Sequence, residues 1–153
     1  MPAHISITLI NDGNIAQHSD EFLHDVAQIM LTLRSQYTEK SLMDTIKVQM
    51  QSGYQIAVLV ADEKPVTLAG FILSYKLAWK KHIYLDDLVT DEKVRGRGYG
   101  QKMLNWLQEY AIEQGCEQLH LDSGVQRFLA HKLYLNQGFN IASHHFSQLL
   151  HGK

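Results

Sequence analysis

The chain has 153 residues, the length of one domain, and its 45% hydrophobic content is enough to bury a core. The formal net charge of −2 argues against a general attraction to nucleic acid or to anionic lipid. Cys116 is the only cysteine, which excludes an intrachain disulfide, and neither a signal-peptide pattern nor a membrane-length apolar run is present. We therefore expect one cytoplasmic domain, residues 1–153, without a nucleic-acid or membrane partner.

The first third of the chain predicts a strand followed by two helices. Residues 4–10 alternate loosely between apolar and polar types and stop at a turn signal, residues 11–14. Thr38 can cap a second helix that ends at Gly53. Ser19 can cap the first helix, whose apolar residues recur at helical spacing: Phe22, Val26, Ile29, Met30 and Leu33.

The next segment predicts three successive antiparallel strands. Residues 54–61, 66–78 and 82–90 are apolar runs rich in β-branched residues, and short polar turns at 62–65 and 80–81 separate them. Turns this short join neighbouring strands, so we expect a meander.

A glycine-rich run, VTDEKVRGRGYGQ at residues 89–101, links the last of these strands to a strong helical pattern. Gly96, Gly98 and Gly100 occupy alternate positions, which lets the backbone bend and lets a ligand approach closely. The following helix begins with N–H groups that have no intrahelical partner, so this junction suits a phosphate. The spacing matches neither a P-loop nor a dinucleotide fingerprint. A lone glycine triplet can also serve only to relieve crowding in a turn.

The remaining pattern adds two strands and a helix. The helix after the glycines ends at Gly115, and it is followed by a strand at 117–122, a helix at 127–137 and a last strand at 139–150. The predicted order is β-α-α-β-β-β-α-β-α-β, a mixed α/β (α+β) fold.

Two motifs make the chain recognisable. Arg95-x-x-Gly98-x-Gly100 follows the fourth predicted strand, and Tyr134-x-x-x-Gly138-Phe139 lies near the end. With this element order the chain resembles the GNAT superfamily of acetyl-CoA-dependent N-acetyltransferases. The resemblance implies a mostly antiparallel central sheet flanked by helices, with acetyl-CoA in a V between the fourth and fifth strands.

The resemblance also implies how acetyl-CoA would be held. Main-chain N–H groups from Arg95 to Gly100 would bind the pyrophosphate, and the strand backbone before them would pair with the pantetheine arm as a peptide pairs with a sheet edge. The expected cofactor residues are Leu88, Val89, Thr90, Arg95, Gly96, Arg97, Gly98, Tyr99, Gly100 and Gln101. Nine histidines show no zinc-type spacing with cysteine, so we expect no metal.

Three residues are candidates for proton transfer. By resemblance, Tyr134 is the general acid that protonates the departing coenzyme A thiolate, although a core tyrosine fits its helical stripe as well. Relatives often place an acidic base on the fourth strand near the position of Tyr84. Asp86 shares the face of Tyr84 by simple alternation, so it is the first choice of base, and Asp87 is the second. A structural role for both carboxylates fits equally well.

The acceptor is expected to be an amine of a small molecule or a peptide. Arg34 and Tyr37 lie where relatives bind acceptors, and Arg127 replaces a common family asparagine. The chain ends 14 residues after Phe139, so a second subunit of a homodimer is one way to close the acceptor pocket.

The competing hypothesis is a non-catalytic acetyl-CoA sensor of the same fold. A nucleic-acid-binding role for Arg95 and Arg97 would need a broad basic face, which the balanced charge does not supply.

Overall fold

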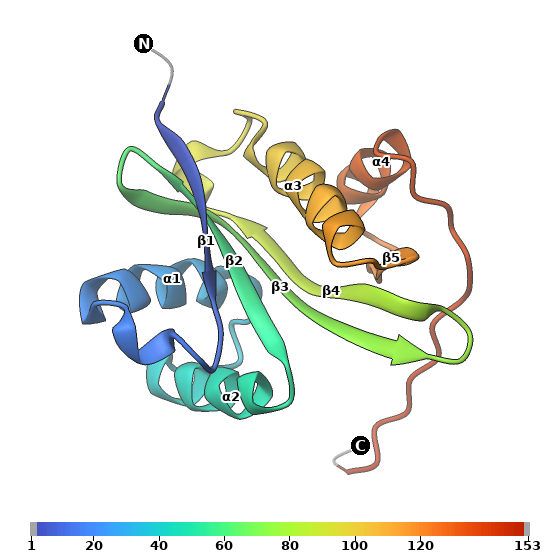
Figure 1. Cartoon of the computed structure of the whole chain (residues 1–153), viewed down its shortest axis with the longest axis horizontal. Coiled ribbons are helices and arrows are strands. Elements are labelled where there is room, and N and C mark those ends of the chain that lie inside the picture. Colours follow the sequence, from blue (N-terminus) through green and yellow to red (C-terminus); the bar gives the residue numbers. More distant parts are fainter. Residues whose placement is uncertain (1–2, 152–153) are drawn as a thin grey trace. The chain divides into compact units, whose positions relative to one another are not determined.

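The computed structural model describes residues 3–151, and Figure 1 labels its strands and α-helices. The chain divides after Leu121 into two compact units, and each is described by itself. The elements of the first unit are β1 (Ile5–Ile10), η1 (Ile15–Gln17), α1 (Asp20–Leu33), α2 (Glu39–Gln51), β2 (Tyr54–Ala61), β3 (Lys64–Lys76), β4 (Lys80–Thr90), η2 (Glu92–Val94), α3 (Tyr99–Glu113) and β5 (Gln118–Leu121). The second unit contains α4 (Phe128–Asn136).

Side-chain caps begin the first two α-helices where the sequence predicted them. The Ser19 hydroxyl accepts a hydrogen bond from the Phe22 N–H at 3.1 Å, which satisfies one of the N–H groups left over at the start of α1. Thr38 and Ser41 form a reciprocal capping box at the start of α2. The short 3₁₀ helix η1 was not predicted, because a segment of three residues is too short to show a helical spacing of apolar residues.

The strands form one sheet in the order β1-β2-β3-β4-β5. β2, β3 and β4 are successively antiparallel, as predicted. β1 is antiparallel to β2, and β4 pairs with β5 in parallel. The β2–β3 hairpin turns over two residues, Asp62 and Glu63, which both have positive φ, as a tight primed turn requires. For this reason β3 already begins at Lys64 and includes Pro65, which the sequence had placed in the turn.

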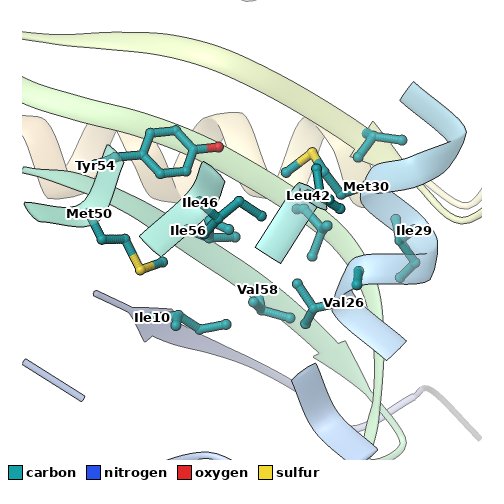
Figure 2. Close-up of a cluster of buried hydrophobic side chains, with 13 residues drawn as sticks. Ile10, Val26, Ile29, Met30, Leu42, Ile46, Met50, Tyr54, Ile56 and Val58 are labelled. Atoms are coloured by element: carbon teal, nitrogen blue, oxygen red, sulfur yellow. The ribbon is translucent and has the colours of Figure 1, made fainter. Parts of the chain in front are cut away.

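Helices α1 and α2 cover one face of this sheet and α3 covers the other. Figure 2 shows side chains from α1, α2 and the strands packed together on the first face. On the opposite face the ring of Phe71 in β3 meets Tyr110 of α3 edge-on, with centroids 5.8 Å apart. The buried cluster of the first face is Ile10, Val26, Ala27, Ile29, Met30, Leu42, Ile46, Met50, Tyr54, Ile56, Val58, Leu68 and Val89.

A β-bulge interrupts the pairing of β3 with β4. Gly70 pairs with Asp87 and the next residue, Phe71, pairs with Leu85, so Asp86 is the extra residue on β4. The alternation of side chains between the two faces of the sheet therefore shifts by one position at Asp86. Counting every second residue along β4 without this bulge assigns the residues beyond it to the wrong face.

The second unit departs from prediction at its end. Helix α4 forms as expected, but residues 139–150 contain no strand in the described structure. Their large apolar residues, Ile141, Phe146, Leu149 and Leu150, are exposed, so this segment has no buried apolar face of the kind that holds a strand in a sheet. The α/β class is confirmed, whereas the last strand of the predicted order is wrong.

Within residues 3–151, no helix has the length and apolar character needed to cross a membrane.

Candidate active site

The central feature of the site is an unpaired edge of β4. The parallel pairing with β5 runs only from His82 with Gln118 to Leu85 with Leu121. From Asp86 to Thr90, β4 is paired with β3 on one side, and no described strand pairs with it on the other. β5 ends at Leu121 and its pairing with β4 stops there, so the V between the two strands that the resemblance implies stays a prediction. A strand edge of this kind offers backbone N–H and C=O groups to an extended ligand.

The glycine-rich loop connects this open edge to α3. Gly96 and Gly98 have φ values of 82° and 78°, a left-handed conformation that favours glycine. A Cβ atom at either position would meet no atom within 4 Å, so the space in front of the loop is empty of protein. Gly98 is the N-cap of α3 and brings no side-chain acceptor, in contrast to Ser19 on α1. The first N–H groups of α3 are therefore available to an anion.

The side chains of the predicted cofactor residues point to a role for backbone rather than side-chain groups on β4. Val89 is buried in the core cluster, and the Thr90 hydroxyl lies 2.9 Å from that of Thr67. Tyr99 is buried in the first turn of α3. The remaining residues of the set are Leu88 and Gly100, which are partly buried, and Arg95, Gly96, Arg97, Gly98 and Gln101, which are exposed.

Asp87 is bound by two residues from distant parts of the chain. Arg34 Nε donates to its Oδ1 at 2.7 Å, and the Tyr54 hydroxyl donates to its Oδ2 at 2.7 Å. Both oxygens of this buried carboxylate are thus engaged, one of them by a permanent positive charge. Burial, and then the charge of Asp87, raise the pKa of the Tyr54 phenol well above its usual value, so Tyr54 remains the donor.

Tyr54 is a site residue that the sequence did not reveal. A Cβ on Gly70 would lie 2.6 Å from Tyr54 Cζ and 2.9 Å from Asp87 Oδ2. Glycine inside a strand often marks a close approach of other groups, so Gly70 was the one available signal. It did not indicate which residue approaches.

Asp86 differs from Asp87 in its exposure. Asp86 is exposed at the bulge. Its backbone carbonyl accepts a hydrogen bond from Arg34 Nη2 at 3.0 Å. The expectation that Asp86 shares the face of Tyr84 was wrong. Tyr84 pairs with Ile72 and Asp87 pairs with Gly70, and these two partners are two residues apart on β3, so Asp87 is the residue on the face of Tyr84.

Arg34 and Tyr37, the weakly predicted acceptor residues, have different positions. Arg34 ends α1 and is directed to Asp87 and the Asp86 carbonyl, so it joins the helix to the bulge. Tyr37 is partly buried and packs against the core cluster. The structure therefore brings Arg34 to the candidate base residues and gives Tyr37 a packing role.

Tyr134 and Arg127 belong to the second unit. Tyr134 lies on α4, is buried, and contacts the ring of Phe139 edge-on with centroids 6.0 Å apart. Burial raises the pKa of the Tyr134 phenol, and the nearby charge of Arg127 partly offsets this rise. Arg127 itself is exposed at the start of α4. The phenol is therefore protonated at neutral pH, which a general acid requires.

The sequence model described as the acetyltransferase (GNAT) family matches residues 23–139. The chain belongs to the GNAT acetyltransferase family. The matched range includes the β4 edge, the glycine-rich loop and Tyr134. The expectation of a single domain over residues 1–153 stays a prediction.

Named relatives of this GNAT chain are N-acetyltransferases. The chain is 28% identical over 120 residues to the uncharacterized N-acetyltransferase YhdJ of Bacillus subtilis, covering 77% of this chain and 84% of that protein. It is 30% identical over 66 residues to the aminoalkylphosphonate N-acetyltransferase of Salmonella typhimurium, covering 43% of each. An aminoglycoside N-acetyltransferase solved in complex with CoA has the same fold, with a TM-score of 0.76, 13% identity and coverage of 97% of this chain and 96% of that chain.

Proposed function

We propose that this GNAT protein transfers the acetyl group of acetyl-CoA directly to a primary amine of a small molecule or a peptide. The observation that carries the proposal is the continuity of the open β4 edge with the loop at Gly96 and Gly98. An extended pantetheine arm needs unpaired strand backbone, and a pyrophosphate needs free N–H groups at its end. The two features follow one another along the chain in the order that coenzyme A requires.

In the proposed reaction, the nitrogen lone pair of the neutral amine attacks the thioester carbonyl carbon. A new C–N bond forms, the C–S bond breaks, and the thiolate leaves with the bonding electrons. Tyr134 supplies the proton that converts the thiolate into a thiol, and its raised pKa keeps this proton in place until it is needed. The amine loses one proton to a base.

We propose Asp86 as this base and assign Asp87 to holding the bulge in place. Asp87 accepts a hydrogen bond on each oxygen, from Arg34 Nε and from the Tyr54 hydroxyl, so neither oxygen faces an incoming amine without a partner already in place. Asp86 is exposed at the bulge beside the open edge, and a water molecule can relay the amine proton to it from the face of Tyr84. Asp86 therefore keeps the role expected from the sequence, but for a different reason, the contacts of Asp87.

The relative that acts on aminoalkylphosphonates supports a small-molecule amine as the acceptor, although it aligns with only part of this chain. A peptide amine remains within the proposal. The expected site is on the side of the sheet that carries α1 and α2. Because α3 packs on the opposite face, an amine that approaches from the α1–α2 side does not meet this helix.

The proposal is tested by mixing the protein with acetyl-CoA and a panel of amines and by measuring release of free thiol. Amine-dependent release with formation of the acetylated amine is expected. If acetyl-CoA binds but no amine is acetylated across the panel, the chain is a non-catalytic sensor of acetyl-CoA instead. Failure to bind acetyl-CoA would contradict both functions.

A further inference from the structure

A group of aromatic side chains lies on the sheet outside the residues assigned so far. Trp79 stacks on His120 with ring centroids 3.5 Å apart and an interplanar angle of 12°. It is also nearly parallel to Tyr84, at 6.0 Å and 17°, and meets His82 edge-on at 5.1 Å. We call these four residues, from the β3–β4 turn, β4 and β5, the aromatic cluster.

The aromatic cluster is on the face of the sheet that carries Asp87. On β3, Tyr84 pairs with Ile72 and Asp87 pairs with Gly70, two residues away. On the neighbouring strand β5, Tyr84 pairs with His120. Paired residues of adjacent strands project to the same face. Tyr84 is also the last position but one at which β4 pairs with β5. The cluster therefore adjoins the open edge, on the side from which we expect the amine.

Lys76 places a positive charge on this cluster. Its Nζ lies 4.2 Å from the centroid of the Trp79 ring and 5.6 Å from that of Tyr84, positions in which an ammonium is attracted to ring faces. Neighbouring Lys80 has a carboxylate partner, Glu117, at 3.8 Å. Lys76 has no acidic partner within ion-pair distance among residues 3–151. The rings thus hold an exposed ammonium in place without neutralising it.

The charge of the surrounding segment decides what this ammonium can bind. Residues 76–82, KLAWKKH, contain three lysines and no acidic residue. A cationic group of a ligand would be repelled here, and the ring faces are already occupied by Lys76. An anionic group would instead gain a positioned partner with three N–H donors.

We propose that Lys76, held over Trp79 and Tyr84, binds an anionic group of the acceptor, so that the acceptor is a zwitterionic amine. The anionic group is a carboxylate or another acidic oxygen group at the end of the molecule opposite to the reacting amine. This inference rests on the proposed acetyl transfer for its catalytic consequence, but the binding of the anion by Lys76 is independent of turnover.

The first test compares three acceptors of equal chain length in steady-state kinetics: δ-aminovalerate, amylamine and cadaverine. Wild type is expected to have the lowest KM for δ-aminovalerate. Lys76→Gln should raise that KM about 3- to 10-fold with little change in kcat, should not change the KM for amylamine, and should be rescued by Lys76→Arg. Lys80→Gln, on the same hairpin but already paired with Glu117, is the matched control and should behave as wild type.

Two kinetic results would overturn the proposal. One is an equal KM for δ-aminovalerate in wild type and Lys76→Gln. The other is a preference for cadaverine that Lys76→Gln strengthens, because the rings would then be a site for a cation that competes with Lys76. Trp79→Phe keeps a ring under Lys76 and should retain the δ-aminovalerate preference, whereas Trp79→Ala should lose it.

A binding measurement separates this inference from the assignment of acetyl transfer. In a Trp106→Phe background, Trp79 is the remaining tryptophan, and its fluorescence can be titrated with δ-aminovalerate in the presence of CoA. A saturable change that Lys76→Gln abolishes, without acetylation of any amine, would support the anion site and contradict the proposed transfer. No change in wild type would overturn the anion site, whatever the activity.

Discussion

The hydroxyl of Tyr54 occupies the space that a side chain at Gly70 would need. From there it donates to Asp87 Oδ2 at 2.7 Å, beneath the bulge that separates Asp86 from the regular part of β4. Tyr54 and Asp87 are 33 positions apart in the sequence, and Arg34 is 53 positions from Asp87. Three segments of the fold thus meet at one carboxylate, next to the edge where we expect the thioester.

This packing predicts that Gly70→Ala is strongly destabilising. The added methyl group would lie within 3 Å of both the Tyr54 ring and Asp87. Overpacking of this kind costs about 1–3 kcal/mol, and displacing Tyr54 from Asp87 would add to it. Gly13→Ala is the control, because its new Cβ would have its nearest neighbour at 3.4 Å. Urea unfolding of the two variants measures the difference, and equal free energies of unfolding would contradict the packing.

Tyr54→Phe tests the hydrogen bond without adding volume. We expect a loss of about 1–3 kcal/mol in the free energy of unfolding, since a buried carboxylate oxygen would lose its donor. The raised pKa of Tyr54 also makes its contribution depend on pH. The contribution is complete below the unfolded-state value of about 10 and declines as pH rises above it. Wild type should therefore lose more stability than Tyr54→Phe between about pH 9 and pH 11, and parallel curves would exclude this linkage.

The phosphate-binding role of the glycine-rich loop predicts a specific effect of Gly98→Val. Acetyl-CoA should raise the Tm of wild type, because it binds the folded state. Valine at position 98 would project into the space in front of the loop and strain a φ of 78°, so the Tm shift should disappear. Gly115→Val carries the same strain, at φ 77°, at the other end of α3, and should keep the shift. A full shift in folded Gly98→Val would refute the assignment.

Tyr134→Phe should lower kcat about 10²- to 10⁴-fold while leaving acetyl-CoA binding nearly unchanged, because only the proton donor is removed. The raised pKa of Tyr134 keeps the phenol protonated up to pH values above about 10, so wild-type kcat should not fall on the alkaline side before then. Tyr75→Phe, at an exposed tyrosine of β3, is the control and should keep wild-type kcat. A wild-type kcat in Tyr134→Phe, with chemistry limiting, would remove Tyr134 from the mechanism.

Asp86→Asn and Asp87→Asn should have opposite phenotypes. If Asp86 accepts the amine proton, Asp86→Asn lowers kcat/KM most at low pH and is partly relieved as rising pH supplies neutral amine. Asp87→Asn should lower stability by about 1–3 kcal/mol, because Arg34 loses its charged partner and a buried contact is weakened. Rate profiles against pH and melting curves for both variants test the pair. Loss of activity without loss of stability in Asp87→Asn would reverse the two roles.

The sequence alone determined the features that depend on neighbours along the chain. Ser19 and Thr38 begin helices because their hydroxyls reach N–H groups two or three residues away, and Gly98 ends the loop because few residues tolerate its φ. Tertiary structure decided the rest. The bulge at Asp86 arises from pairing with β3, and it reverses which aspartate shares a face with Tyr84. The last predicted strand does not form in the described residues, because a strand needs a partner edge and an apolar face, and neither can be read from residues 139–150 alone. The contacts of Asp87 with Tyr54 and Arg34 likewise exist only once distant segments are folded together, since no local rule spans such separations.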